Sequence, residues 1–278
     1  MPTQTEKALA FRALHARPGA FVIPNPWDAG SALLLSTLGF EALATTSAGF
    51  AFSIGRRDSE GGLSRAETLA NARAIVEATD LPVSADLENG FGRDPEDCAE
   101  TIRAASVVGL AGGSIEDSSG DGARPIYDLS LAVERVSAAV EAARSLPVPF
   151  VLTARAENFL HGRPDLDDTI SRLQAFEKAG AEVLYAPGLT NLDQIRTVCA
   201  SVSRPVNVVM GLAGGTFSVQ QLADAGVKRI SLGSSLARAA LGALMRAAGE
   251  IRQNGTFTFA SEAMPFAVAQ RQMRSKNA

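Results

Sequence analysis

Two acidic residues, Asp86 and Glu88, stand one residue apart in the stretch SADLENGFGRD, where an apolar run gives way to a glycine-rich segment. A third acid, Glu116, ends the next apolar run in GGSIED. Carboxylates that converge repel one another unless a proton or a cation neutralises them. Oxygen ligands without His or Cys beside them suit Mg²⁺ or Mn²⁺ rather than zinc. We therefore predict that Asp86, Glu88 and Glu116 form a metal site, in which some of the acids act through water.

A simpler interpretation is that these acids only cap the helices that follow them. One strand-end acid alone would favour that interpretation. Several acids together with Arg155, which ends the following run in VLTARAEN, favour a site. An arginine there can bind a substrate carboxylate through paired hydrogen bonds. An ion pair of Arg155 with Glu157 or Glu116 is compatible with this role, because an arginine held by one acid can still face a ligand.

A strand followed by a helix recurs along the chain. Amphipathic stretches such as 64–79, 128–144 and 167–181 separate the apolar runs, and glycines end helices in EKAGAEVL and ADAGVKRI. This alternation predicts an α/β protein whose residues 1–278 form one (β/α)8 TIM barrel domain. A doubly wound open sheet is the alternative, disfavoured because no G-x-G-x-x-G follows the first run. The predicted strands are 21–26, 42–47, 82–86, 112–117, 149–157, 183–188, 206–211 and 229–235.

Functional residues in such barrels gather at the carboxyl ends of the strands. After the second predicted strand, the backbone N–H groups of Ser47, Ala48 and Gly49 could bind a developing oxyanion. Asp58 follows about ten residues later and could fold back towards the metal. Asn207, in the seventh predicted strand, is a further candidate for binding substrate.

Other segments have simpler interpretations. The glycines of 211–215 and 233–235 could bind phosphate in a barrel, but turns are favoured because no lysine or arginine accompanies them. His15 lies in a predicted N-terminal helix and is expected at the surface or in packing. His161 follows the fifth strand in a loop, where contact with substrate is the less favoured interpretation. Neither histidine has a Ser or Cys partner in a triad motif.

Composition excludes several classes of protein. The chain of 278 residues is 46% apolar and 20% charged, with a net charge of −4, so nothing indicates a nucleic-acid or membrane surface. No signal peptide and no membrane span is predicted. Cys98 and Cys199 have no metal-ligand spacing and are interpreted as buried small hydrophobes in a reducing cytoplasm.

The motifs together resemble the isocitrate lyase / phosphoenolpyruvate mutase superfamily. The resemblance runs from about residue 18 to about residue 245 and is carried by PNPWDAGSALLLSTLGFEALATTSAGFA, GRRD, VSADLENGFG, GGSIEDS, TARAENF and GAEVLYAPGL. It implies a barrel whose last helix is exchanged between the subunits of a homodimer or homotetramer. It also implies Mg²⁺-dependent chemistry on small 2-oxo or 2-hydroxy acids through an enolate-like intermediate, at C–C or P–C bonds.

Matched by motif, Asp86 resembles the acid nearest the metal. Glu88 stands where many members have aspartate, and Glu116 where they have glutamate. Arg155 resembles the substrate-binding arginine, and Asp58 the acid of a G-x-x-D segment. The resemblance makes Asp58, Arg155 and Glu116 the candidates for the chemical step.

The turn at 47–49 resembles the family's oxyanion-binding turn, whereas the loop after the fourth strand departs from the family. Isocitrate and methylisocitrate lyases carry K-[KR]-C-G-H there, with a cysteine that supplies a proton, and the phosphonate enzymes carry a lysine- and asparagine-containing loop. Residues 116–128 read EDSSGDGARPIYD instead, with Arg124 as the only cation.

Three functions remain open. The first is a Mg²⁺-dependent C–C lyase, similar to an oxaloacetate decarboxylase or a methylisocitrate lyase, and decarboxylation suits a loop without Cys or His. The second is a phosphonate enzyme, either a carboxyphosphonoenolpyruvate or phosphoenolpyruvate phosphonomutase or a phosphonopyruvate hydrolase, using Asp58, Ser118 or Ser119. The third is a barrel that binds a 2-oxo acid without turning it over.

The C-terminal stretch 251–278 follows the expected last helix and is apolar in patches. We predict that it packs on another subunit. The apolar residues are Phe257, Phe259, Met264 and Phe266.

Overall fold

The computed structural model describes residues 2–58, 61–212 and 215–273. Parallel strands form one sheet in the order β1-β8-β7-β6-β5-β4-β3-β2, and β1 pairs with β8. The remaining seam is bridged by a hydrogen bond of 3.0 Å from the Ala44 N–H to the Pro24 carbonyl, next to β1. The prediction of a (β/α)8 barrel is confirmed, and the doubly wound sheet is excluded. The strands are β1 Phe21–Ile23, β2 Leu43–Ala44, β3 Val83–Asp86, β4 Gly112–Glu116, β5 Val151–Arg155, β6 Val183–Tyr185, β7 Val206–Val209 and β8 Arg229–Ser231.

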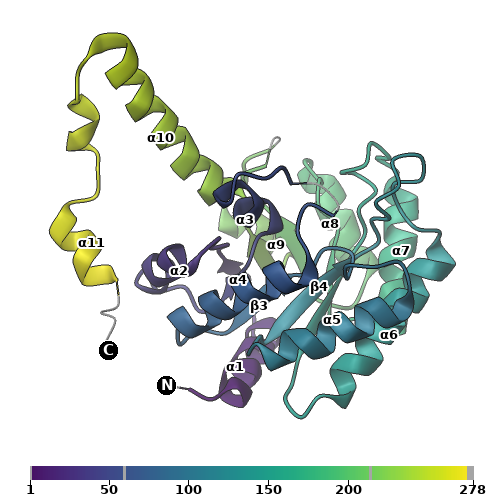
Figure 1. Cartoon of the computed structure of the whole chain (residues 1–278). Coiled ribbons are helices and arrows are strands. Elements are labelled where there is room, and N and C mark those ends of the chain that lie inside the picture. Colours follow the sequence, from purple (N-terminus) through teal and green to yellow (C-terminus); the bar gives the residue numbers. More distant parts are fainter. Residues whose placement is uncertain (1, 59–60, 213–214, 274–278) are drawn as a thin grey trace.

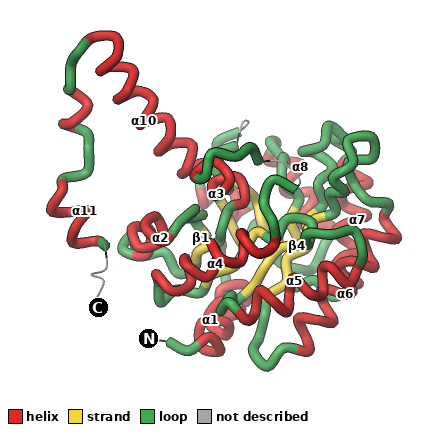
Figure 2. Tube along the Cα trace, viewed as in Figure 1, coloured by secondary structure: helices red, strands yellow, loops and turns green. Residues whose placement is uncertain are grey.

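The helices surround the strands, which lie at the centre of the molecule (Figures 1 and 2). Local sequence sets their ends. A capping box joins Ser64 and Glu67 at the start of α4, and Gly180 ends α7 in the left-handed region with φ 107°. The helices are α1 Gln4–Ala16, α2 Ala29–Ser36, α3 Ser47–Ser53, α4 Arg65–Ala78, α5 Pro95–Val107, α6 Leu129–Ser145, α7 Leu166–Ala179, α8 Leu192–Ser201, α9 Val219–Asp224, α10 Ser235–Asn254, the 3₁₀ helix η1 Thr258–Ser261 and α11 Phe266–Gln272.

Helix α1 packs its apolar face onto the amino-terminal end of the barrel. His15 is buried there, with its ring centroid 4.8 Å from that of Phe11 and 5.1 Å from that of Phe21. Burial lowers the pKa of His15 to about 3, and the charge of Arg229 acts in the same direction. His15 is therefore a neutral packing residue, which was one of the two roles expected for it.

Helix α10 leaves the barrel, and the chain beyond it lies apart from the strands (Figure 1). Large apolar side chains are exposed along this extension, and the described chain covers them only in part. They are Leu241, Leu244, Met245, Ile251, Phe257, Met264, Phe266 and Met273. Among the described helices, none combines the length and the apolar character that crossing a bilayer requires.

Candidate active site

Arg155 lies at the carboxyl end of β5 and contacts acids from the ends of β3, β4 and β5. Its Nη1 is 2.9 Å from Asp86 Oδ1, its Nη2 is 3.1 Å from Glu116 Oε2, and its Nε is 2.8 Å from Glu157 Oε1. Strand register produces this contact, because Glu116 and Arg155 are direct partners in the β4–β5 pair. The structure thus brings together three of the residues that sequence patterns indicated, and joins them in one buried ion-pair cluster.

Asp86 is held from several sides. Its Oδ2 accepts hydrogen bonds from the N–H and the hydroxyl of Ser47, at 3.3 and 2.9 Å. Its Oδ1 accepts a hydrogen bond of 3.4 Å from the Glu88 N–H, in addition to the contact with Arg155. The Asp86 carboxylate is therefore fixed at the point where β2 and β3 end.

The segment after β3 has an unusual backbone. Glu88 and Phe91 adopt positive φ values of 48° and 62°, in a region of the backbone map that residues other than glycine rarely occupy. Arg135, buried on α6, holds this segment by donating hydrogen bonds to the carbonyl oxygens of residues 89, 92 and 93. Sequence reasoning missed Arg135. The sequence does mark Arg135 as unusual, because it is a charged residue on the apolar face of a helix, between the buried Ala132 and Ala139.

The predicted oxyanion turn is the first turn of α3. The Ser47 N–H donates to Asp86, and the Gly49 N–H donates to the Thr46 hydroxyl at 3.1 Å. Of the three N–H groups at positions 47 to 49, only that of Ala48 has no hydrogen-bond partner in the described part of the chain. An oxyanion role for the turn therefore depends first on Ala48.

Burial and neighbouring acids raise carboxyl pKa values in the cluster. The pKa of Glu116 lies well above its ordinary value because the carboxyl is buried, although Arg155 opposes this and the nearby acids reinforce it. Burial, and then the charge of Asp86, also raise the pKa of Asp58. Asp58 therefore lies near enough to the cluster to sense its charge, as the sequence predicted.

The cluster carries more negative than positive charge, since Arg155 is the only cation among the described residues that contacts Asp86, Glu116 and Glu157. This excess and the carboxylate oxygens fit a hard divalent cation. The described residues contain no group of three His, Cys, Asp or Glu arranged as a direct metal shell. Asp86 and Glu116 face Arg155 instead, so the donors fit a cation bound largely through water. The acids concerned are Asp58, Asp86, Glu88, Glu116 and Glu157.

A second buried ion pair lies directly behind the cluster. Asp117 Oδ1 accepts the Glu157 N–H at 2.8 Å, and its Oδ2 is 3.0 Å from Arg172 Nη1. Arg172 Nη1 also donates to the Tyr127 carbonyl at 2.9 Å, at the far end of the loop that begins with Asp117. Arg172 was missed for the same reason as Arg135, because it is an arginine on the buried face of its helix, beside Leu173.

Asn207 lies inside the barrel, where it is almost fully buried. Its Nδ2 donates to the Ser231 hydroxyl at 3.0 Å, and its Oδ1 accepts from Arg229 Nε at 2.8 Å. It lines a cavity of about 60 Å³ on the barrel axis, so its role in binding substrate stays a prediction. The cavity is lined by Ile23, Asn25, Ala44, Thr45, Thr46, Ser84, Ala85, Asp86, Ser114, Arg155, Tyr185, Asn207, Arg229, Ser231 and Gly233.

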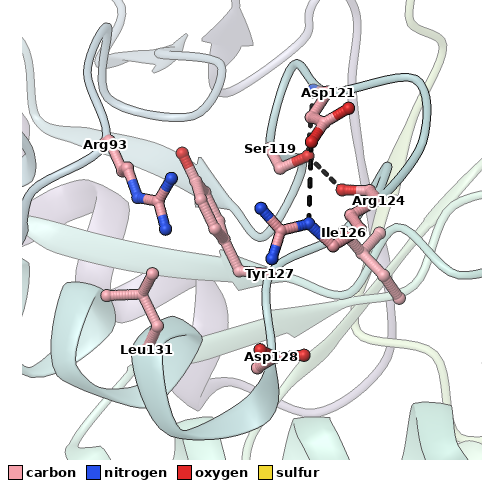
Figure 3. Close-up of a pocket in the computed structure, with 8 residues that line it drawn as sticks. All are labelled: Arg93, Ser119, Asp121, Arg124, Ile126, Tyr127, Asp128 and Leu131. Atoms are coloured by element: carbon pink, nitrogen blue, oxygen red, sulfur yellow. Dashed lines mark hydrogen bonds and ion pairs between the residues drawn. The ribbon is translucent and has the colours of Figure 1, made fainter.

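The β4–α6 loop, residues 117–128, folds back on itself through a bridge between Ser118 and Ile126. Arg124 and Arg93 lie on either side of the Tyr127 ring, around a cavity of about 90 Å³ (Figure 3). Arg124 Nε is 3.6 Å from Asp121 Oδ2. The one cation of this loop therefore faces a small pocket beside the site and makes no ion pair with the carboxylate cluster.

A cleft of about 660 Å³ lies between residues 61–65, 88–92 and 119–121. Glu88 lines it, so the cleft reaches the carboxylate cluster. The β4–α6 loop forms one wall. This cleft is large enough for a small organic acid.

The remaining candidates lie elsewhere. The His161 side chain makes no hydrogen bond or ion pair within the described ranges. The turn predicted at 211–215 includes Ala213 and Gly214, which lie outside the described residues. Cys98 is buried and Cys199 half-buried, and burial raises the pKa of each thiol to about 11.

A barrel with acids and an arginine at its strand ends defines a class of enzymes, and comparison with known proteins identifies the family. The model of the phosphoenolpyruvate phosphomutase family matches residues 11–252. The chain therefore belongs to this family, whose members are typically metal-dependent. The family and its relatives are lyases and mutases, which confirms the resemblance and the prediction of an enzyme.

Individual proteins are similar over nearly the whole chain. A crystal structure from Burkholderia cenocepacia J2315, provisionally described as a lyase/mutase, is 59% identical, covers 98% of this chain and 97% of that one, and has a TM-score of 0.96. A second structure from that organism, provisionally described as a phosphonomutase, is 36% identical over 90% and 99% of the chains, with a TM-score of 0.80.

Lyases that act on organic acids are also among the relatives. The crystal structure of a 2,3-dimethylmalate lyase is 27% identical over 98% of this chain and 95% of that one, with a TM-score of 0.86. The 2-methylisocitrate lyase of Shewanella oneidensis is 31% identical over 255 residues, which are 89% of this chain and 86% of the relative.

Proposed function

We propose that this protein is a Mg²⁺-dependent lyase that cleaves a C–C bond of a small 2-oxo or 2-hydroxy acid through an enolate. The observation that carries the proposal is the buried cluster in which Arg155 contacts Asp86 and Glu116 at the strand ends. The similarity to 2-methylisocitrate and 2,3-dimethylmalate lyases supports this substrate class.

The metal would be held by Asp86, Glu88 and Glu116 largely through bound water molecules. Mg²⁺ supplies charge that stabilises an oxyanion developing on the substrate, and Mn²⁺ could serve in the same position. The negative charge of the cluster supports a divalent cation here.

The chain's own residues bind and orient the substrate. Arg155 would bind a substrate carboxylate, with its guanidinium kept in place by Glu157 on the side away from the other two acids. The Ala48 N–H, which has no partner among the described residues, would donate to the developing enolate oxygen. Glu116, whose pKa is raised above its ordinary value by burial, is a candidate to take up or release a proton during the reaction. Asp58, at the edge of the cluster, is a second proton acceptor or donor.

The β4–α6 loop favours a bond whose cleavage needs no strong acid. It contains no Cys, His or Lys. Decarboxylation of an oxaloacetate-like 2-oxo acid breaks the bond from C3 to its carboxylate, leaves the electron pair in an enolate and releases CO₂, which takes no proton when it leaves. Ser119 donates its hydroxyl to the Arg124 carbonyl and Ser118 is buried, so neither is presented as a nucleophile for phosphoryl transfer. The lyase is therefore preferred over the phosphonate enzyme.

An assay of bond type tests the proposal. The purified protein with Mg²⁺ is given oxaloacetate, 2-methylisocitrate, 2,3-dimethylmalate and phosphonopyruvate in separate reactions, and pyruvate and phosphate are both measured. We expect an oxo acid from one of the C–C substrates, above the spontaneous rate, and its loss with EDTA and in Glu116→Ala. Phosphate or phosphoenolpyruvate from the phosphonate, with no C–C cleavage, would replace the lyase by the phosphonate enzyme. A rise in thermal stability on adding one of these acids, without any turnover, would indicate a protein that binds a 2-oxo acid and does not convert it.

We further propose that the protein works as a homodimer or homotetramer. The apolar side chains of α10 and of the chain beyond it are exposed in the described structure, including Leu244, Met245 and Phe266. A second copy of the chain, contributing the same extension in return, would cover both sets. The substrate is a small molecule, and the net charge of −4 supports neither a nucleic-acid nor a membrane partner. A cytoplasmic location is part of the same proposal.

A further inference from the structure

The cavity on the barrel axis is lined by two buried arginines with different surroundings. Arg155 contacts three acids, whereas Arg229 contacts no carboxylate in the described ranges. Arg229 Nε donates to Asn207 Oδ1 at 2.8 Å, and its Nη2 donates to the Thr153 hydroxyl at 3.0 Å. Its Nη1 is buried and has no hydrogen-bond partner among the described residues.

Arg229 is a buried charge without a counter-ion. Only 5% of the residue is exposed. Burial lowers the pKa of Arg229 to about 10, so the guanidinium remains protonated at neutral pH. Tyr185 supplies no negative charge, because burial raises the pKa of its phenol. A buried ion is strongly disfavoured unless an opposite charge or polar groups satisfy it.

We infer that this cavity binds a small monoanion, the size of a halide ion or one carboxylate group, which compensates the charge of the Arg229 guanidinium. The volume of about 60 Å³ is well below the ~150 Å³ of a cavity that accommodates benzene, which limits the occupant to a few heavy atoms. The hydroxyls of Ser84, Ser114 and Ser231 line the same space and can donate to an anion.

The anion has two sources with the same chemistry. The cavity is also lined by Asn25, Asp86 and Gly233 at the carboxyl ends of the strands, so it lies next to the candidate active site. The occupant is either a free small anion or one carboxylate of the bound substrate. The second source rests on the proposed function, whereas the site itself does not.

Water is the competing occupant. The Nε2 of His15 is also buried without a partner among the described residues, and Arg229 lies near enough to lower the pKa of this histidine. A water shared between the two side chains would satisfy both atoms while leaving the charge of Arg229 uncompensated.

Anomalous diffraction from crystals of the full chain soaked in sodium bromide distinguishes these occupants. We expect an anomalous peak inside the cavity lined by Arg229, Ser84, Ser114 and Ser231. Bromide at the surface only, with the cavity empty or filled by water, would overturn the inference. The readout needs no turnover, so it stands or fails independently of the proposed function.

A repeat of the soak with Mg²⁺ and oxalate identifies the source of the anion. Displacement of the bromide would assign the position to a substrate carboxylate. Bromide retained beside bound oxalate would assign it to a free anion.

Thermal unfolding supplies a second test in solution. Adding sodium bromide or formate at constant ionic strength should raise the Tm of the wild-type protein and then saturate, because a ligand that binds only the folded state stabilises it. Arg229→Gln should lose this response, whereas Arg73→Gln, at an exposed position on α4, should keep it. Equal responses in wild type and Arg229→Gln would contradict the site. If Arg229→Gln does not fold, the bromide soak of the wild type decides.

Discussion

Asp117 accepts the backbone N–H of Glu157 at 2.8 Å, and this bond ties the start of the β4–α6 loop to the segment that follows β5. Glu157 in turn holds Arg155. Asp117 contacts neither substrate nor metal in the proposed mechanism. Through Glu157 it nevertheless helps to position Arg155, which would bind the substrate. Burial raises the pKa of Asp117 to about 6 from an ordinary value of 3.8.

The raised pKa of Asp117 predicts how stability changes with pH. Between pH values of 3.8 and about 6, the folded protein keeps a proton that the unfolded chain has lost. The free energy of unfolding should therefore fall as pH rises through this window, by an amount on the order of 3 kcal/mol from this group. Asn at position 117 does not titrate, so the free energy of unfolding of Asp117→Asn should lack this decrease. Measured by urea unfolding between pH 4 and 7, the free energies of the wild type and the variant should therefore converge or cross as pH rises. Parallel curves would contradict the shift.

Arg155→Met should abolish activity and also destabilise the fold. It removes the only cation that contacts Asp86, Glu116 and Glu157 among the described residues. Breaking a buried pair from one side costs about 3–5 kcal/mol, because the opposite charge stays buried. Arg124→Met, in the exposed part of the β4–α6 loop, is the matched control and should change stability by less than about 0.5 kcal/mol. Unfolding in denaturant checks both, and a stable Arg155→Met would disprove the pairing.

Glu88→Gly should separate stability from activity. Glu88 has a φ of 48°, which costs a non-glycine residue about 1 kcal/mol or more. Glycine relieves this strain, so Glu88→Gly should have a higher Tm than Glu88→Ala, while metal-dependent activity falls at least tenfold. Glu88→Ala keeps the strain and removes the same carboxylate, so it should be as inactive but less stable than Glu88→Gly. Full activity in both variants would remove Glu88 from the metal site.

Arg135→Met should release the segment that carries Glu88. The arginine donates hydrogen bonds to the carbonyl oxygens of residues 89, 92 and 93, and its guanidinium carbon lies 4.4 Å from the centroid of the Tyr127 ring. We expect a lower kcat/KM and faster hydrogen exchange of the 88–93 amides. Arg144→Met, at an exposed position of the same helix, should change neither. Unchanged hydrogen exchange of these amides in Arg135→Met would show that the 88–93 segment keeps its conformation without Arg135.

Removing residues 255–278 or introducing Leu244→Glu should dissociate the proposed oligomer. Leu244 is exposed on α10 and is available to a second copy. Light scattering should give a dimer or tetramer for the full chain and a smaller species for the variants. A full-length monomer would reject the subunit exchange.

Much of the fold was predictable because alternating strands and helices leave a periodic pattern. Helices α4, α6 and α7 begin and end close to the ranges expected from that pattern. The strand-end acids and Arg155 were predictable for the same reason, since parallel strands deliver their carboxyl ends to one edge. The start of α3 at Ser47, only three residues after the end of a two-residue strand, was not expected.

The supporting arginines could not be placed from the sequence. Arg135, Arg172 and Arg229 are paired with groups far away along the chain, such as Asp117 for Arg172, 55 residues earlier. Nothing local specifies such partners. A charged residue on an otherwise buried face was the only available sign, and it indicates a buried bond without naming the partner.

Enolate formation can be measured without knowing the natural substrate, as exchange of the C3 protons of an oxo acid with solvent, followed by proton NMR in D₂O. Forming an enolate at the carboxylate cluster must labilise these protons whichever substrate the enzyme uses. We predict that pyruvate or 2-oxobutyrate exchanges faster than the buffer rate with Mg²⁺, and that EDTA, Glu116→Ala and Arg155→Met each remove the excess. Exchange at the buffer rate with the metal-loaded wild-type protein would contradict the enolate mechanism.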